Sequence, residues 1–196
     1  MPGDTMWKIA RNNGIGLSDL IAANPQIINP TLILPGQTIN IPSIPSIPGM
    51  PSIPSTPTTP TTTTAPSDIR ALETEVIRLV NAERAKAGLS ALTENSELTR
   101  IARIKSEDFV KNNYFSHNSP TYGTPFEMLR SFGVNFTAAA ENIASGQRTA
   151  SEVMNSWMNS SGHRANILNS TYNQIGVGVA RDNDGSLFWT QLFIRS

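Results

Sequence analysis

The segment VMNSWMNSSGHRANIL, residues 153–168, combines a helical apolar pattern with one of the two histidines of the chain. Val153 and Trp157 are four positions apart, so a helix would place both of them on one buried face. His163 follows the predicted helix, and the other histidine, His117, lies far upstream in the segment NYFSHNSP. The segment therefore raises the question of whether the fold brings the two histidines to a single site.

The residues around this segment predict an α+β domain of about 130 residues. Apolar residues recur at helical spacing in four stretches, two of which begin with a Thr-x-x-Glu capping box, at Thr124 and at Thr149. Two stretches typical of strands follow, and the turn RDNDG between them predicts an antiparallel hairpin. The predicted helices cover residues 67–87, 96–113, 124–133 and 149–162, and the predicted strands cover residues 174–180 and 186–194.

Composition narrows the classes of function. The 15 basic and 15 acidic residues give no net charge, which argues against a nucleic-acid partner. No apolar run approaches the roughly 20 residues of a membrane-spanning helix, and the first residues lack the basic and apolar regions of a secretory signal. The chain has no cysteine, which removes disulfides, thiolate metal ligands and cysteine nucleophiles. We therefore expect no nucleic-acid partner and no membrane insertion.

A proline-rich segment separates two parts of different composition. Prolines recur at every third position from Pro42 to Pro60, which matches the three residues per turn of polyproline II. At about 3.1 Å per residue, such a segment could hold its ends up to roughly 75 Å apart. A spacer is the favoured interpretation, and a ligand for an aromatic-lined groove is the alternative. The sequence thus predicts a module at residues 1–42, a linker at residues 43–66 and a domain at residues 67–196.

The first part of the chain predicts two short helices followed by a strand. Its segments PGDTMWKIA, LSDLIAANPQI and LILPGQTINIP resemble successive parts of a LysM domain. The resemblance implies a βααβ module that binds N-acetylglucosamine polymers such as peptidoglycan or chitin. The first strand of that pattern would precede the PGDT turn, where Met1 and Pro2 stand, so we expect an incomplete module. By this resemblance, one wall of the glycan groove comprises Gly3, Asp4, Thr5 and Met6, and the other runs from Ile27 to Leu32.

The C-terminal domain has few residue types that could carry chemistry. Ser160 and Ser161 lie near His163, but neither stands in a nucleophile elbow such as G-x-S-x-G, so a serine triad is not favoured. The two histidines could instead bind a divalent transition metal together with a carboxylate from a distant segment. Glu141, in AAAENIASG, is the candidate carboxylate because the small residues around it would let it face inward. Structural alternatives remain: His163 as a helix cap or solvated side chain, Glu141 as a helix N-terminal charge, and His117 as a hydrogen-bond donor in a loop.

Four segments of this domain resemble, in order, the CAP superfamily of cysteine-rich secretory, antigen 5 and pathogenesis-related proteins. These segments are NYFSHNSP, AAAENIASG, VMNSWMNSSGHRANIL, and IGVGVARD with FWTQLFI. The resemblance implies an α-β-α sandwich whose central cleft, in several members, holds two histidines and two glutamates, sometimes with zinc. It assigns His117 and His163 to the two histidines and Glu141 to the first glutamate. Ser160 stands where the second glutamate of the eukaryotic pattern falls. Glu152 is the nearby carboxylate that could replace this glutamate, but its predicted role in the capping box is favoured.

Together the two resemblances imply a bacterial protein located in the cell wall, in the spore coat or outside the cell. The LysM-like module would target peptidoglycan or another N-acetylglucosamine polymer, and the CAP domain would act as the effector or binding domain. The alternative is a hydrolase of wall polymer or of protein, in which Glu141 exchanges protons. In that case His117 and His163 would bind a metal, with zinc as the expected cofactor, or polarise the substrate. No protein partner is indicated by the sequence.

Overall fold

The computed structural model describes the C-terminal domain continuously over residues 66–196, apart from the side chains of residues 66 and 67. In the N-terminal part, the described residues are 6, 9, 10, 13, 15, 20, 21, 23–27 and 36–42. The predicted linker lies outside the described residues, except for its last position.

Within residues 66–196, four strands form one sheet in the order β1-β3-β4-β2. β4 is antiparallel to β3 on one side and to β2 on the other, and the short β1 pairs in parallel with the start of β3. The predicted C-terminal hairpin is confirmed, because β3 and β4 are joined by a tight turn with Gly185 at φ +86°. The strands are β1 Thr93–Glu94, β2 Ala138–Ser145, β3 Gln174–Arg181 and β4 Leu187–Arg195.

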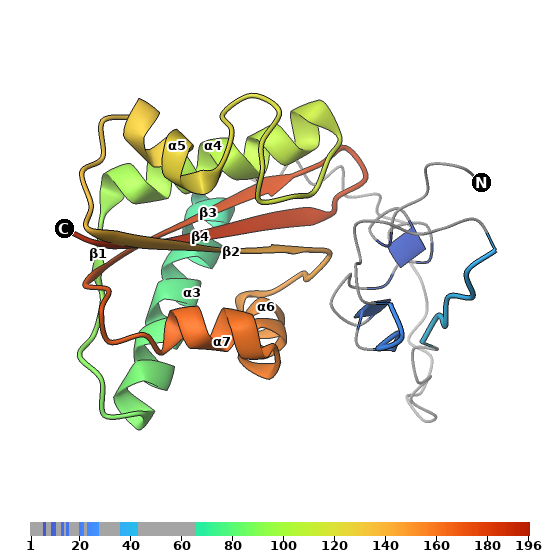
Figure 1. Cartoon of the computed structure of the whole chain (residues 1–196), viewed down its shortest axis with the longest axis horizontal. Helices are drawn as coiled ribbons and strands as arrows, with labels where there is room; N and C mark the ends of the chain where they lie inside the picture. The colour runs from blue at the N-terminus through green and yellow to red at the C-terminus, as the bar shows by residue number, and fades with distance from the viewer. Residues whose placement is uncertain are drawn as a thin grey trace, which may run out of the picture.

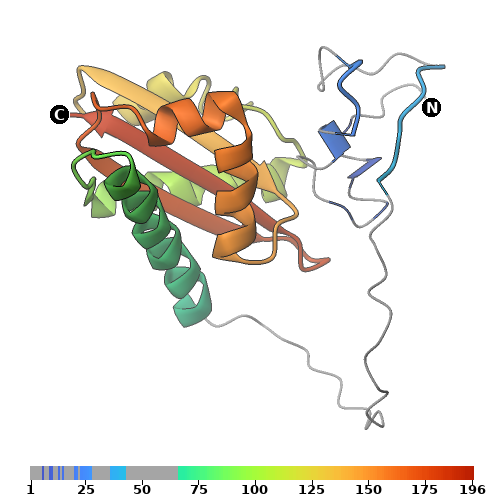
Figure 2. The same ribbon diagram turned by 90° about the horizontal axis from the view of Figure 1, so that it is seen from below.

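Helices cover both faces of this sheet (Figure 1). α4 and α5 lie on one face, and α3, α6 and α7 lie on the other, as the turned view in Figure 2 also shows. The predicted α+β class and α-β-α sandwich are therefore confirmed. The helices are α3 Pro66–Lys86, α4 Ser96–Asn112, α5 Pro125–Ser131, α6 Ala150–Asn159 and α7 Ser161–Ile167.

Several predicted elements differ from the observed ones. The predicted helix over residues 149–162 is instead two helices that meet at Ser160, whose extended backbone (φ −99°, ψ 121°) ends α6 and begins α7. α3 begins at Pro66, one residue before the predicted N-cap Ser67. Residues 138–145 form the unpredicted strand β2, because pairing with β4 along the whole stretch outweighs the poor strand propensity of Ala, Glu and Asn.

The two predicted capping boxes form to different extents. At α5 the box is complete, since the Thr124 side chain accepts from the Glu127 N–H while the Glu127 carboxylate accepts from the Thr124 N–H. At α6 the Thr149 hydroxyl accepts from the Glu152 N–H at 3.1 Å. The Glu152 carboxylate instead accepts from the N–H of Arg148, one residue earlier, at 2.7 Å. Both carboxylates thus satisfy backbone donors near a helix start.

Two glycines of β3 let α4 pack directly on the sheet. A Cβ atom on Gly176 would lie 2.3 Å from the backbone of Leu98, and one on Gly178 would lie 2.0 Å from the backbone nitrogen of Arg103. Any side chain at these positions would push α4 away, since packed interiors hold no room for it. The alternating residues of the same strand point to the opposite face, where they join the larger core. They are Ile175, Val177 and Val179.

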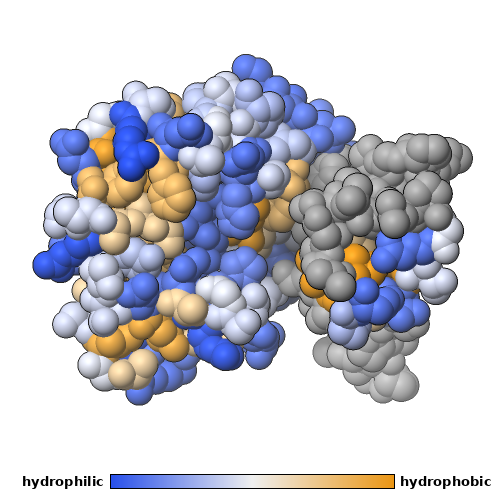
Figure 3. All heavy atoms as spheres, viewed as in Figure 1, coloured by the Kyte–Doolittle hydropathy of each residue, from blue (hydrophilic) through white to orange (hydrophobic). Residues whose placement is uncertain are grey.

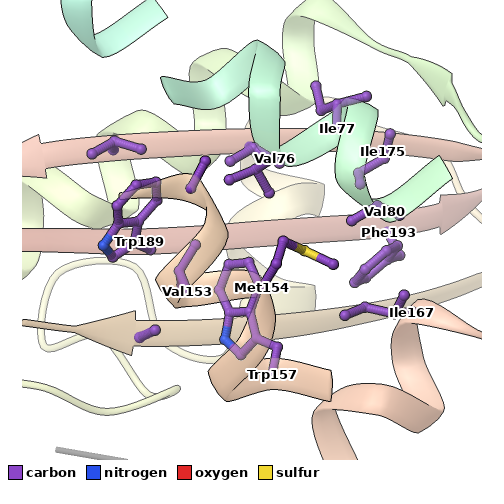
Figure 4. Close-up of a cluster of buried hydrophobic side chains, with 14 of the residues drawn as sticks. Val76, Ile77, Val80, Val153, Met154, Trp157, Ile167, Ile175, Trp189 and Phe193 are labelled. Carbon is purple, nitrogen blue, oxygen red and sulfur yellow. The ribbon is translucent and has the colours of Figure 1, made fainter. Parts of the chain in front are cut away.

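This larger core lies between the sheet and α3, α6 and α7 (Figure 4). Trp157 from α6 and Trp189 from β4 are fully buried in it, together with Val76 of α3. The Trp157 indole N–H donates to the Ile143 carbonyl of β2 at 3.3 Å, so its polar atom is satisfied inside the core. The prediction that Val153 and Trp157 share a buried face is confirmed.

Beyond β1, the free edge of β3 is capped by the buried carboxylate of Glu73, which pairs with the partly exposed Arg103. The Glu73 carboxylate of α3 accepts the Val179 N–H at 3.2 Å. It also accepts two hydrogen bonds from the Arg103 guanidinium of α4, at 3.0 and 2.6 Å. The pair satisfies an otherwise open strand edge and joins the two helical layers around it.

The surface of the domain is mainly hydrophilic, with apolar patches (Figure 3). The exposed Phe126 of α5 packs against Phe136, and the Arg130 guanidinium lies 5.1 Å from the centre of the Phe136 ring. Among the described helices, none combines the length and the apolar character that a bilayer-spanning segment requires.

The described residues of the N-terminal module include a small apolar cluster. Its buried members are Met6, Ala10, Leu20 and Ile27. The buried Asn24 donates to the carbonyls of Leu20 and Asn40, at 2.6 and 2.7 Å, and accepts from the Asn40 N–H at 2.6 Å. Asn24 thus joins the segment around Leu20 to the segment around Asn40 by hydrogen bonds.

Candidate functional site

His117 lies in the loop of residues 113–123, which joins α4 to α5. The loop begins at Asn113, whose left-handed backbone (φ 50°) ends α4. It is closed by two backbone hydrogen bonds between Ser119 and Gly123, at 2.8 and 3.0 Å. The side chain of His117 is 55% exposed, so the loop presents the imidazole to solvent.

Glu141 lies in β2, and its side chain is only 2% exposed. Its Oε1 atom lies 2.7 Å from Nδ1 of His117, so the structure brings these two predicted site residues together. A carboxylate in its ionised form only accepts, so in that form it pairs with an imidazole that donates from Nδ1 and, when the ring is neutral, accepts at Nε2. The second carboxylate oxygen, Oε2, is buried and has no hydrogen-bond partner within the described part of the chain.

His163 lies in the first turn of α7 and is partly buried. Burial lowers the pKa of the His163 imidazole, and the charge of a protonated His117 would lower that pKa further. A neutral imidazole is therefore favoured near neutral pH. No hydrogen bond joins the imidazoles of His117 and His163 within the described part of the chain, and only His117 contacts Glu141.

β2 also fixes the backbone that carries His163. Asn142 follows Glu141 and therefore faces the other side of the strand. Its amide donates to the His163 carbonyl at 3.2 Å. The amide of Asn166, also in α7, donates to Asn142 Oδ1 at 2.8 Å. Two adjacent residues of one strand thus position both histidines: Glu141 contacts the imidazole of His117, and Asn142 holds the backbone of α7.

Ser160, at the position of the missing second glutamate, forms the junction between α6 and α7. Its side chain makes no capping hydrogen bond to α7. Glu152 does not replace that glutamate, because its carboxylate is exposed and bonds the backbone at the start of α6.

In the structure, the Glu141 carboxylate contacts the imidazole of His117. The described residues contain no group of three or more His, Asp or Glu side chains that could hold a metal ion. Glu141 already accepts from Nδ1 of His117, which is the role of a carboxylate that orients a ligand rather than of a ligand itself. Zinc binding by His117 and His163 stays a prediction.

Two buried charged residues beside the site were not predicted from the sequence. Lys105 and Asp108, 1% and 5% exposed, lie in α4, and the Lys105 ammonium donates to the His117 carbonyl at 2.8 Å. One signal in the sequence could have revealed Lys105. Ile101, Lys105 and Phe109 recur at four-residue spacing, so a lysine stands within the apolar stripe of a helix.

The residues predicted to line the glycan groove are only partly described. Met6 and Ile27 are buried in the apolar cluster of the N-terminal module, so their side chains contribute to its packing. Gly3, Asp4, Thr5 and Leu32 lie outside the described residues. The groove therefore stays a prediction.

Comparison with known families accounts for both parts of the chain. The model of the cysteine-rich secretory protein family, CAP, matches residues 77–193. The chain belongs to the CAP family. The CAP match includes all four strands of the sheet together with His117, Glu141 and His163. The LysM domain model matches residues 2–42, so both predicted resemblances are confirmed.

Several relatives share one of these parts. The CAP domain is 53% identical over 130 residues to YkwD of Bacillus subtilis (strain 168), covering 66% of this chain and 49% of YkwD. A solved extracellular protein with an SCP domain from Bacillus anthracis str. Ames is 34% identical with a TM-score of 0.60, covering 72% of this chain and 45% of that one. The LysM module is 49% identical over 41 residues to the spore coat assembly protein ExsA of Bacillus cereus, covering 21% of this chain and 6% of ExsA. The chain thus spans about half the length of the first two relatives.

Proposed function

We propose that this CAP protein acts at the cell wall or the spore coat, where its LysM module binds an N-acetylglucosamine polymer such as peptidoglycan. The observation that carries the proposal is the presence in one chain of a LysM match over residues 2–42 and a CAP match over residues 77–193. LysM is a glycan-binding family, and a relative of this module is named for spore coat assembly. A relative of the CAP domain is named as extracellular, which supports a location outside the cell membrane.

In this proposal the LysM module raises the local concentration of the CAP domain near glycan. The chain has no net charge, so general electrostatic attraction to an anionic wall does not provide this localisation. The linker predicted between the two parts would set how far from the anchor the CAP domain can act.

The CAP domain would present His117 as a hydrogen-bonding group for the wall polymer. The imidazole is exposed, and its Nδ1 atom lies 2.7 Å from the Glu141 carboxylate, a contact that favours the tautomer with the proton on Nδ1. A neutral imidazole held in this way offers Nε2 as an acceptor, which suits the hydroxyl and amide donors of glycans and their peptides. Binding of this kind requires neither a metal nor a covalent step.

A sedimentation experiment tests the LysM part of the proposal. We expect the full chain to pellet with purified peptidoglycan while residues 67–196 alone stay in solution. A full-length Asp4→Ala/Thr5→Ala variant is the matched control, because it keeps the linker and the CAP domain, and we expect it to pellet less. Equal pelleting of the full chain and the CAP domain alone would contradict the proposal.

A second candidate function is hydrolysis of wall polymer or protein, and the His117–Glu141 pair is the observation that favours it. Glu141 fixes the proton on Nδ1 of His117 and can stabilise the imidazolium that forms when Nε2 takes a proton. With water as the attacking group, this pair would serve as a general base without a serine or cysteine nucleophile. His163, neutral and nearby, would be available to hydrogen-bond the substrate.

Substitution of the pair tests this second function. Cell wall or casein would be incubated with the wild type, Glu141→Gln and His117→Asn, each with zinc and with a chelator. If the pair is the general base, both variants should lose at least about a hundredfold in rate. Activity that is unchanged in Glu141→Gln would exclude the assignment. If the wild type is active with zinc and inactive with the chelator, the two histidines would instead be candidates for metal ligands.

A further inference from the structure

His117 is held at a defined position although its own side chain is not buried. Its side chain is more than half exposed, and it belongs to a loop that forms neither helix nor strand, apart from the bridge between Ser119 and Gly123. An exposed loop residue samples many conformations unless other contacts fix the backbone. Nevertheless its Nδ1 meets a buried carboxylate at hydrogen-bond distance. Contacts elsewhere in the loop must therefore hold it.

One set of contacts comes from Asp108. This buried carboxylate of α4 accepts four side-chain hydrogen bonds, and three of the donors lie in the loop on both sides of His117. Burial alone would raise the pKa of Asp108, but the hydrogen bonds outweigh it and lower that pKa below the ordinary value. The donors are Tyr114 at 2.6 Å, Ser119 at 2.6 Å, Thr121 at 2.7 Å and Asn112, within α4, at 2.6 Å.

A second contact comes from Lys105, one turn earlier on the same face of α4. Its ammonium group donates to the carbonyl of His117 at 2.8 Å, and so holds the backbone of the histidine directly. It also lies 5.0 Å from the centre of the Phe109 ring and 5.3 Å from that of Tyr114. A fully buried lysine is uncommon without such partners, because removing the ammonium group from water is costly.

Lys105 and Asp108 also interact electrostatically. Burial lowers the pKa of the Lys105 ammonium, whereas the charges of Glu141 and Asp108 raise it. A single buried cation thus lies near two buried carboxylates, one that fastens the loop and one that receives the imidazole. Displacement of the loop would leave these charges without their partners, which is strongly unfavourable in a protein interior.

We infer that Lys105 and Asp108 form a buried clamp on α4 that positions the His117 loop against Glu141. Asp108 fastens both flanks of the loop through side chains, and Lys105 fastens its centre through the His117 carbonyl. Both are positioning residues, since neither is exposed to a ligand. The inference concerns the geometry of the CAP site, so it holds or fails independently of the proposed glycan binding.

The clamp can be tested through the hydrogen bond that it is inferred to maintain. In the full chain with labelled histidine, the Nδ1–H of His117 should give a downfield proton resonance that exchanges slowly with water. We expect Lys105→Met and Asp108→Asn to speed this exchange at least about tenfold, because the loop opens locally. Lys111→Met and Glu107→Gln, exposed charges of the same helix, are matched controls that should leave the exchange rate unchanged.

An internal reference separates positioning from general destabilisation. The Trp189 indole N–H donates to the Gln147 carbonyl in the core, and its exchange should stay as in the wild type. If Lys105→Met does not fold, Tyr114→Phe and Thr121→Val each remove one donor to Asp108 and should each speed the exchange of the His117 signal. A slow His117 signal in the folded variants, or equal acceleration of the His117 and Trp189 signals, would overturn the inference.

Discussion

Asp108 and Glu141 are both buried carboxylates, but their surroundings give them different roles. Asp108 accepts four side-chain hydrogen bonds, so its oxygens are occupied and it acts as a structural anchor. Glu141 accepts one, from His117, and its Oε2 atom has no partner in the part of the chain that the structure describes. A buried acceptor left unpaired is costly, and such atoms concentrate at functional sites. Of the two carboxylates, Glu141 is therefore the one suited to chemistry or ligand binding.

We predict that Asp108→Asn lowers the free energy of unfolding by an amount that depends on pH. The folded pKa of Asp108 is lowered, so its stabilisation is present above the unfolded value of about 4 and is lost as the pH falls through the folded pKa. We expect the substitution to reduce the free energy of unfolding by about 2 kcal/mol at pH 7. The difference from the wild type should shrink at pH 3. Urea unfolding at both pH values measures it, and an equal difference at both would contradict the prediction.

Among the helices, α4 both packs on the sheet and carries the residues that hold the loop of the candidate site. One part of the helix packs on the glycines of β3, and the Ser106 hydroxyl donates to the Gly178 carbonyl at 3.0 Å, so its distance from the sheet is fixed. The same helix carries Lys105 and Asp108, which hold the loop of His117. A shift of α4 relative to the sheet would therefore also move His117 relative to Glu141.

We predict that Gly178→Ala destabilises the CAP domain by about 1–3 kcal/mol or more, because the new methyl group would overlap the backbone of α4. Gly162→Ala is the matched control. It lies in α7 with no atom within 4 Å of a new Cβ and with no positive φ, so we expect a neutral effect or a gain of up to about 1 kcal/mol. Urea unfolding of the two variants compares these costs, and equal stability would show that the contact between α4 and β3 can relax.

At the scale of the whole molecule, the chain joins a LysM module to a CAP domain through a segment with proline at every third position. A polyproline II segment is stiff compared with a flexible linker of the same length. The spacing of the two parts should therefore be set by proline content, which bears on how far from its anchor the CAP domain acts.

We predict that spin labels at Ile41→Cys and Asp68→Cys give a most probable distance above about 45 Å in the wild-type linker background. Replacement of residues 43–65 by a Gly/Ser segment of equal length should shorten it to about 30 Å, the value for a flexible coil. Because the chain has no cysteine of its own, the two labels are unambiguous. Equal distances in the two proteins would contradict a stiff spacer.

Features that depend on a few neighbouring residues could be predicted from the sequence alone. Helical periodicity, the Thr124 capping box and the RDNDG turn predicted α5, α6 and the C-terminal hairpin, because each signal acts within a few positions. The ordered motifs identified the CAP and LysM families, which the family matches confirm. They also singled out His117, Glu141 and His163 as the residues to examine.

How these residues come into contact depends on long-range packing in the folded domain. His117 and Glu141 are 24 positions apart, and neither the strand that buries Glu141 nor the clamp of Lys105 and Asp108 follows from local pattern. β2 is a strand because β4 pairs with it, despite residues that disfavour a strand in isolation. The charged side chains of α4 are tolerated in the interior because the loop that follows the helix folds back and satisfies them. Such contacts depend on long-range packing, whose energy local propensity does not contain.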